Sequence, residues 1–388
     1  MDKKEGQLGE GRLESLDALR GFDMLFIMGL AWFVYEFCVA CGWQDTWLAR
    51  QMTHTTWDGL YHHDTIFPLF LFIAGLAFPF SCAKRRARGW SDGRIACDIL
   101  RRVVILFFLG LVYNGLLAGT LRMGAVLSRI GVAWGVAALL YLRVGWRGRL
   151  GVAVGILVGY WMLLWLCPAP DRFALEIPKE FAAWGNGPFS LVGNLSGWID
   201  RHWMPGILPH NGSLCDNQSA LGYIPAVATA LLGLFCGEFV RSTRGRLSGG
   251  RQTLAMLGWA AVELLLGLWI AYGFGEMSFP VNKKLWSSSF VLVVGAYSTA
   301  IFALFYWLID VRRWWRRTLF LRVIGMNAIT IYLAQKVVGF NQANKFLFDG
   351  LWSFFPAAWH EPLMAFSYMA ICWLFLYYLY RKGIFLRV

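Results

Sequence analysis

Residues 52–81 read MTHTTWDGLYHHDTIFPLFLFIAGLAFPFS, and they set the interpretation of the rest of the chain. Three of the six histidines, His54, His62 and His63, stand with the carboxylates Asp58 and Asp64 directly before an apolar run. The run predicts a membrane-spanning helix over residues 62–82. Titratable side chains at the mouth of such a helix are the first place to look for chemistry.

The composition is that of a membrane protein. Of the 388 residues, 58% are hydrophobic and 15% are charged, whereas a soluble domain carries about 25% charged residues. Long apolar runs recur along the chain, and each must be helical because hydrocarbon offers no water to backbone groups. The sequence therefore predicts a single all-α, polytopic domain over residues 1–388 with ten spans, at 17–41, 62–82, 99–118, 125–142, 150–167, 220–240, 253–272, 285–309, 321–341 and 361–381.

The net charge of +13 follows the positive-inside pattern and not a nucleic-acid-binding face. Basic residues gather in alternate segments between the expected spans, at 84–94, 143–149, 241–251, 312–317 and 381–387. This alternation predicts that both termini are cytoplasmic and that His54 faces the opposite side. The polar first 14 residues and the long apolar run after them predict a retained first span, not a cleaved signal peptide.

One long loop, residues 168–219, is too polar to span and too aromatic to be a disordered linker, so it predicts a folded external cap. Cys167 and Cys215 flank this loop, and a disulfide between them is one alternative if that side is oxidising. No metal site is expected, because the adjacent His62 and His63 point apart on a helix.

His54 and Asp64 are the candidate catalytic residues. A neutral imidazole acts as a general base or as a nucleophile that accepts an acyl group, and the alternative is an interfacial histidine in an aromatic belt. Asp64 lies in the first turn of the expected helix, where it serves either as a cap or as the group that orients an imidazole.

Several polar residues fall inside or beside apolar runs, where ionisable groups mark functional or paired sites. Arg20 lies three residues from both Asp17 and Asp23 and either pairs with them or binds an anion. Arg129 and Asn327 lie within runs, and with Lys283 they are candidates to face a common polar cavity. An arginine there suits phosphate recognition through its planar fork.

Seven segments in order resemble a known family. They are Ser15–Gly21 (SLDALRG), His54–Gly59 (HTTWDG), Asp64–Gly75, Val126–Gly131 (VLSRIG), Gly197–Arg201, Phe279–Ser287 (FPVNKKLWS) and Gly325–Asn327. Over nearly its whole length the chain resembles the transmembrane acetyltransferases typified by lysosomal heparan-α-glucosaminide N-acetyltransferase, and more closely their bacterial relatives found with amino-sugar utilisation genes.

The resemblance implies transfer of acetyl from cytoplasmic acetyl-CoA to the amine of a glucosamine-type sugar on the periplasmic side of a bacterial inner membrane. The family's active-site histidine falls on His54, acting as base or as acetyl acceptor, with Asp64 beside it. The residues expected to hold acetyl-CoA are Arg20, Arg101, Arg129, Arg322 and Asn327. Those expected to hold the sugar are Trp57, Asp58, Asn282 and Lys283. A homodimer is expected from the family alone.

One departure concerns the first span, where lysosomal members carry an asparagine and this chain has Gly29-Leu30-Ala31. It leaves open whether the acceptor is free glucosamine, an oligosaccharide or a cell-wall fragment. Two other classes of function are alternatives to the acetyltransferase. An amino-sugar permease predicts uptake without acetyl-CoA, and a scaffold or binding protein predicts that truncating Arg129 affects stability alone.

Overall fold

A computed structural model describes residues 13–119, 121–208, 211–315 and 318–386, so the basic residues Arg316, Arg317 and Arg387 lie outside the described part. Within these ranges the secondary structure is helical, with two isolated bridges and no strand. The chain forms two compact units. Unit 1 contains the chain up to His54, Tyr61–Ile66 and the chain from Ile301 on; unit 2 contains Thr55–Leu60 and Phe67–Ala300.

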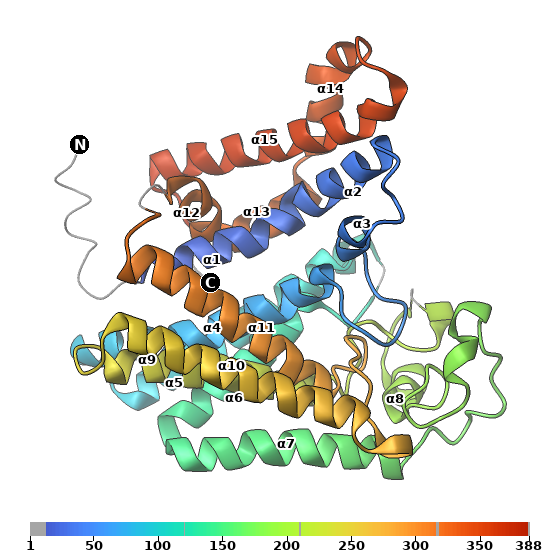
Figure 1. Cartoon of the computed structure of the whole chain (residues 1–388), viewed down its shortest axis with the longest axis vertical. Helices are drawn as coiled ribbons and strands as arrows, with labels where there is room; N and C mark the ends of the chain where they lie inside the picture. Colours follow the sequence, from blue (N-terminus) through green and yellow to red (C-terminus); the bar gives the residue numbers. More distant parts are fainter. Residues whose placement is uncertain (1–12, 120, 209–210, 316–317, 387–388) are drawn as a thin grey trace. The chain divides into compact units, whose positions relative to one another are not determined.

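Unit 1 is built from the two ends of the chain (Figure 1). Its elements are α1 (Glu14–Leu25), η2 (Phe26–Leu30), α2 (Ala31–Ala40), α3 (Trp47–Gln51), η7 (Tyr306–Val311), α12 (Leu319–Met326), α13 (Ala328–Val337), α14 (Phe340–Trp352), η8 (Ala357–Trp359) and α15 (His360–Lys382). Helix α1 packs on α12, and α15 packs on α2 and α14.

Unit 2 is the central part of the chain. Its elements are α5 (Asp92–Tyr113), η3 (Leu116–Ala118), α6 (Val126–Arg143), α7 (Trp146–Leu166), η4 (Lys179–Trp184), α8 (Leu195–Trp203), η5 (Asn211–Ser213), α9 (Tyr223–Thr243), α10 (Gly249–Tyr272) and η6 (Gly275–Met277). Helices α4 (His62–Ala87) and α11 (Ser288–Phe305) each run across the boundary between the units.

The all-α membrane architecture is confirmed. Eight helices of the described chain are long and apolar enough to cross a membrane: Glu14–Ala40, His62–Ala87, Val126–Arg143, Trp146–Leu166, Tyr223–Thr243, Gly249–Tyr272, Ser288–Val311 and Ala357–Lys382. Two of the ten expected spans are helical but fall outside this set. Helix α5 carries Asp98, Arg101 and Arg102 within its apolar part, and the expected span 321–341 is divided at Asn327 into α12 and α13.

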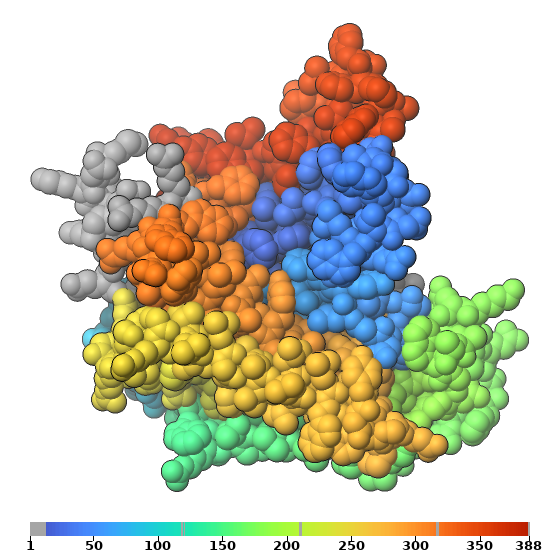
Figure 2. Space-filling view, in the orientation of Figure 1, coloured from blue at the N-terminus to red at the C-terminus, as the bar shows by residue number. Residues whose placement is uncertain are grey.

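The folded cap expected between Pro168 and Ser219 is present, and Figure 2 shows it in green as one compact mass. Phe181, Phe189 and Leu191 of the cap are buried in one cluster with Trp57 and with Tyr160 of α7. Burial of these large side chains supplies the cap's stability at about 25 cal/mol per Å² of apolar surface. The cap is therefore an integral part of unit 2.

Glycines let helices α4 and α9 touch backbone to backbone. A Cβ built on Gly75, Gly233 or Gly237 would overlap a carbonyl oxygen of the facing helix, at Ala230, Phe72 and Leu76 respectively. Gly233 and Gly237 have the small-x-x-x-small spacing that allows close helix packing in membranes. In unit 1, Gly21 of α1 and Gly325 of α12 meet the facing backbone in the same way.

Gly233→Ala should destabilise the protein by about 1–3 kcal/mol, because a methyl group added to a packed contact forces the backbones apart. The measurement is the thermal unfolding midpoint of detergent-solubilised protein. Gly155→Ala is the matched control, because Gly155 on α7 has open space around its Cβ position. It should be neutral or stabilising by up to about 1 kcal/mol. Equal effects of the two substitutions would contradict the packing argument.

Candidate functional site

His54 and Asp64 are in contact in unit 1. His54 Nδ1 lies 2.7 Å from Asp64 Oδ1, and the carboxylate is buried while the imidazole is about half exposed. An ionised carboxylate only accepts hydrogen bonds, so with Asp64 ionised this contact is made by the tautomer that carries the proton on Nδ1. The pair therefore has the arrangement of a histidine whose tautomer and ring orientation are fixed by an acid.

The start of helix α4 holds this acid in place. The backbone N–H of Tyr61 donates to the second oxygen of Asp64 at 3.3 Å, so Asp64 closes the first turn of the helix while it binds His54. The His63 ring lies 4.6 Å from the His54 ring, centroid to centroid, and Gln51 accepts from the backbone N–H of His62 at 2.8 Å. These contacts are compatible with both alternatives considered for Asp64, cap and orienting group, and its role stays a prediction.

In unit 2 two distant sequence segments meet. The backbone N–H of Gly59 donates to the carbonyl of Val281 at 2.9 Å, and the Lys284 ammonium donates to the carbonyl of Thr56 at 2.8 Å. Burial raises the pKa of Asp58, opposed by hydrogen bonds from the backbone N–H groups of Gly59 and Val281. The structure thus brings Asp58 together with the segment that holds Asn282 and Lys283.

The turn at residues 282–287 is tightly specified. Asn282 is fully buried; its Oδ1 accepts from the Leu285 N–H at 2.9 Å, and its Nδ2 has no partner among the described residues. Trp286, also fully buried, has a φ of 55°, a conformation unusual for a bulky residue. Its indole N–H donates to Thr229 at 3.1 Å. Backbone strain of this kind persists only where the surroundings enforce it.

Arg129 lies at the back of this turn. The guanidinium is fully buried, its carbon lies 5.0 Å from the Trp286 ring centre and 5.3 Å from that of Tyr223, and Nη2 donates to the Ser219 carbonyl at 3.0 Å. Nε and Nη1 have no partner among the described residues. Arg129 therefore ties α6 to the end of the cap and to the strained turn, and it retains two directed donors.

The other residues expected to bind the donor fall into two groups. Arg20 and Arg322 of unit 1 flank the close α1–α12 crossing; Arg20 pairs with Asp17 at 3.6 Å and Arg322 donates to the Tyr380 hydroxyl at 2.7 Å. Asn327, which lies between α12 and α13, is buried with its Nδ2 unpartnered in the described chain. Arg101 is exposed on α5 in unit 2.

Trp57 is 1% exposed. Its indole N–H donates to the Phe189 carbonyl at 2.9 Å, and the Lys284 ammonium lies 5.7 Å from its ring centre. This geometry makes Trp57 an anchor of the cap, and its role in sugar binding stays a prediction.

The cap contains an acidic centre to which the sequence analysis assigned no role, although Asp200 lies in the Gly197–Arg201 motif. Asp200 accepts from the backbone N–H groups of Ala220 at 2.9 Å and Asp216 at 3.2 Å, and Asp216 forms a two-pronged ion pair with Arg122 at 2.9 and 3.1 Å. Isolated carboxylates in a long loop give no periodic signal, so only the folded cap identifies them.

Cys167 is exposed and Cys215 is buried, and the disulfide considered between them is not formed. Among the described residues no group of three or more His, Cys, Asp or Glu side chains is placed to hold a metal ion.

Taken together, these helices and polar clusters define a multi-pass, all-α membrane protein with a folded cap. No protein-family model matches the chain. It is 26% identical to the heparan-alpha-glucosaminide N-acetyltransferase of Homo sapiens, over 97% of this chain and 60% of that protein. It is 25% identical to the Mus musculus enzyme of the same name, over 98% and 62%. The chain is a distant relative of these N-acetyltransferases and spans about 60% of their length.

The pKa of Asp200 predicts a pH dependence of stability. Burial, assisted by the charge of Asp216, raises that pKa from 3.8 to about 6 against the opposing backbone hydrogen bonds. Because the pKa of Asp200 is higher in the folded than in the unfolded state, protonation of this carboxyl stabilises the fold. The stabilisation from protonated Asp200 is complete below about pH 4, and it is lost as the pH rises through 6.

The stability of wild type relative to Asp200→Asn should therefore fall by roughly 2–3 kcal/mol between pH 4 and 7. Thermal unfolding in detergent across this range measures the difference. Asp349→Asn, on an exposed position of α14, is the control and should give parallel profiles. Parallel profiles for Asp200→Asn would show that this carboxyl does not titrate near pH 6.

Proposed function

We propose that this chain is a transmembrane N-acetyltransferase that moves acetyl from acetyl-CoA to the amine of a glucosamine-type sugar. The observation that carries the proposal is the 2.7 Å bond between His54 Nδ1 and Asp64 Oδ1. The distant similarity to named N-acetyltransferases supports the same reaction class.

In the direct reaction, the acceptor amine attacks the thioester carbonyl carbon while His54 Nε2 takes a proton from the amine nitrogen. The new C–N bond forms, the C–S bond breaks, and the CoA sulfur leaves as a thiol with the proton from the imidazolium. Asp64 stabilises the positive imidazolium through the Nδ1 hydrogen bond. In the two-step alternative, Nε2 attacks the thioester carbonyl carbon, the C–S bond breaks and CoA leaves as a thiolate, with the positive acetyl-imidazolium stabilised by Asp64. The amine then attacks the acetyl carbon, the bond to Nε2 breaks, and the proton lost by the amine passes to the CoA thiolate.

Acetyl-CoA is a polyanion, so its phosphates require cations. We assign this role to Arg20 and Arg322, which flank one helix crossing, and to the exposed Arg101, with Asn327 supplying an amide donor. Arg129 is fully enclosed by Ser219, Tyr223 and Trp286, and we assign it to holding the Asn282 turn in shape. The sugar would be bound by Trp57, Asp58, Asn282 and Lys283.

The basic loops favour a bacterial inner membrane location with both termini cytoplasmic, donor entry from the cytoplasm and acetylation of a periplasmic sugar. A homodimer is proposed by resemblance to the family.

An amino-sugar permease is the second candidate. One observation favours it: the helix pair α12–α13 is broken at Asn327, and discontinuous helices at polar sites are frequent in transporters. It predicts uptake of labelled glucosamine into proteoliposomes without acetyl-CoA.

His54→Ala should lower acetyl transfer by roughly 10²–10⁴-fold, because the base or nucleophile is removed. Purified protein is incubated with labelled acetyl-CoA and glucosamine, and label in N-acetylglucosamine is measured. His360→Ala, at a half-buried histidine of unit 1 whose Nε2 bonds the Phe355 carbonyl, is the control and should retain activity. Full transfer by His54→Ala would refute the mechanism, and uptake without transfer by wild type would favour the permease.

Asp64→Asn tests the orienting role separately. The amide keeps the size of the side chain and an oxygen to accept from the Tyr61 N–H, but it removes the charge that stabilises the imidazolium. We expect kcat to fall about 10²–10⁴-fold with little change in KM or in the unfolding midpoint. If the fall in kcat came with a comparable fall in the unfolding midpoint, or if kcat did not change, Asp64 would be assigned to capping the helix alone.

A further inference from the structure

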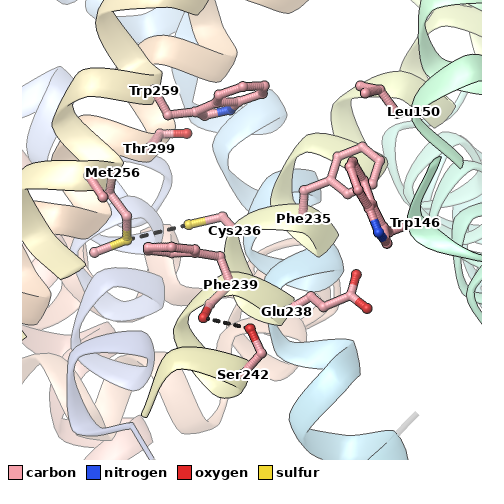
Figure 3. A pocket seen from close by; sticks show the side chains of 11 residues that line it. Trp146, Leu150, Phe235, Cys236, Glu238, Phe239, Ser242, Met256, Trp259 and Thr299 are labelled. Carbon is pink, nitrogen blue, oxygen red and sulfur yellow. Dashed lines mark hydrogen bonds between the residues drawn. The ribbon is translucent and has the colours of Figure 1, made fainter. Parts of the chain in front are cut away.

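A cavity of about 560 Å³ lies in unit 2 between helices α7, α9, α10 and α11 (Figure 3). Its volume falls within the roughly 300–1,000 Å³ of ligand pockets. None of the residues assigned to acetyl transfer lines it. All four helices belong to candidate spans, so the cavity lies at the depth of hydrocarbon.

The end of the cavity at Trp259 and Thr299 presents an apolar surface, because the polar atoms of its lining residues are bonded to other protein groups. Trp259 and Thr299 line it, but the indole N–H of Trp259 donates to Glu263 at 2.6 Å and the Thr299 hydroxyl donates to Glu263 at 3.3 Å. Cys236 is likewise in contact with the Met256 sulfur at 3.7 Å. With these polar atoms satisfied, the inner wall suits a hydrocarbon chain.

The opposite end of the cavity, at the start of α7 and the end of α9, is polar and basic. Trp146, the first residue of α7, and Glu238 and Ser242 near the end of α9 line it. The adjoining helix ends and the turn between α9 and α10 carry the arginines of the segments 143–149 and 241–251. The guanidinium carbon of the exposed Arg147 lies 5.5 Å from the Trp146 ring centre, which places a cation directly beside the cavity lining.

A second cation is built into the same end. Arg149 is 2% exposed and donates from Nη2 to Glu238 at 2.6 Å, with its guanidinium carbon 4.7 Å from the Tyr141 ring centre. Its Nε and Nη1 are buried and have no partner among the described residues. Arg149 therefore pairs with the one carboxylate of this lining, and the exposed Arg147 beside Trp146 leaves a net positive charge at this end.

We propose that this cavity is a binding site for an anionic phospholipid, with one acyl chain between α7, α9 and α10 and the headgroup phosphate at Arg147, beside the Arg149–Glu238 pair. An apolar chamber at hydrocarbon depth with cations at its interfacial end matches both parts of such a lipid. Basic pockets between spanning helices bind anionic headgroups elsewhere for the same reason. The site is independent of the acetyl-transfer residues.

Photolabelling in nanodiscs tests the site. The probes are phosphatidylglycerol and phosphatidylcholine, each with a diazirine in the acyl chain, and labelled peptides are mapped by mass spectrometry. Wild type should be labelled on α7, α9 and α10 at the cavity, more strongly by phosphatidylglycerol. Ala255→Trp, which fills the cavity from α10, should remove this labelling, whereas Ala261→Trp, exposed on the same helix outside the lining, should retain it.

Arg147→Gln tests the headgroup contact without touching the buried Arg149. It should weaken the preference for phosphatidylglycerol by about fivefold, the effect of one cation at an anionic lipid surface. If the Ala255→Trp variant were labelled as strongly as wild type, the proposed site for the acyl chain would be refuted. Equal labelling by the two lipids in wild type would refute the anionic headgroup. Neither outcome depends on acetyl transfer, so the test stands apart from the proposed function.

Discussion

The absence of water in the hydrocarbon is the constraint on which this structure depends. Backbone N–H and C=O groups must bond within the chain, which makes every span a helix, and buried polar side chains must find partners within the protein. The consequences are visible in pairs such as Glu263 with Trp259 and Arg149 with Glu238. Helix association then depends on close packing, for which Gly75, Gly233 and Gly237 allow backbone contact.

Against this background the exceptions carry the functional interest. His54 and Asp64 meet at the first turn of α4, where free backbone donors allow one carboxylate to close the helix and to bind an imidazole. In unit 2, the strained Trp286 and the unpartnered amide of Asn282 cost free energy that a purely structural turn would avoid. Arg129 retains two donors behind them. The unpartnered donors of Asn282 and Arg129 lie at the turn to which sugar binding is proposed.

Much of the fold could be predicted from the sequence because long apolar runs report burial in lipid directly. The helices over Tyr223–Thr243 and Gly249–Tyr272 lie within a few residues of their expected positions. The prediction of spans was incomplete where polar or charged residues interrupt an apolar run. An apolar run continues through Asn327, yet the helix breaks there, and α5 combines an apolar length with five charged residues. A hydropathy average over a window hides single polar residues, whereas the helix can break at one of them.

The sequence by itself determined that this protein is a bundle of membrane helices with a folded cap, and it identified His54 and Asp64 as a pair worth testing, since both conclusions rest on local composition and spacing. Only the tertiary structure decided which distant groups meet: Asp58 with Val281, Arg129 with Ser219, and Asp200 with Ala220. It also revealed the cavity at Trp146 and Glu238. The physical reason is that helix periodicity is a local property of the chain, whereas partners far apart in sequence are fixed by how the helices pack.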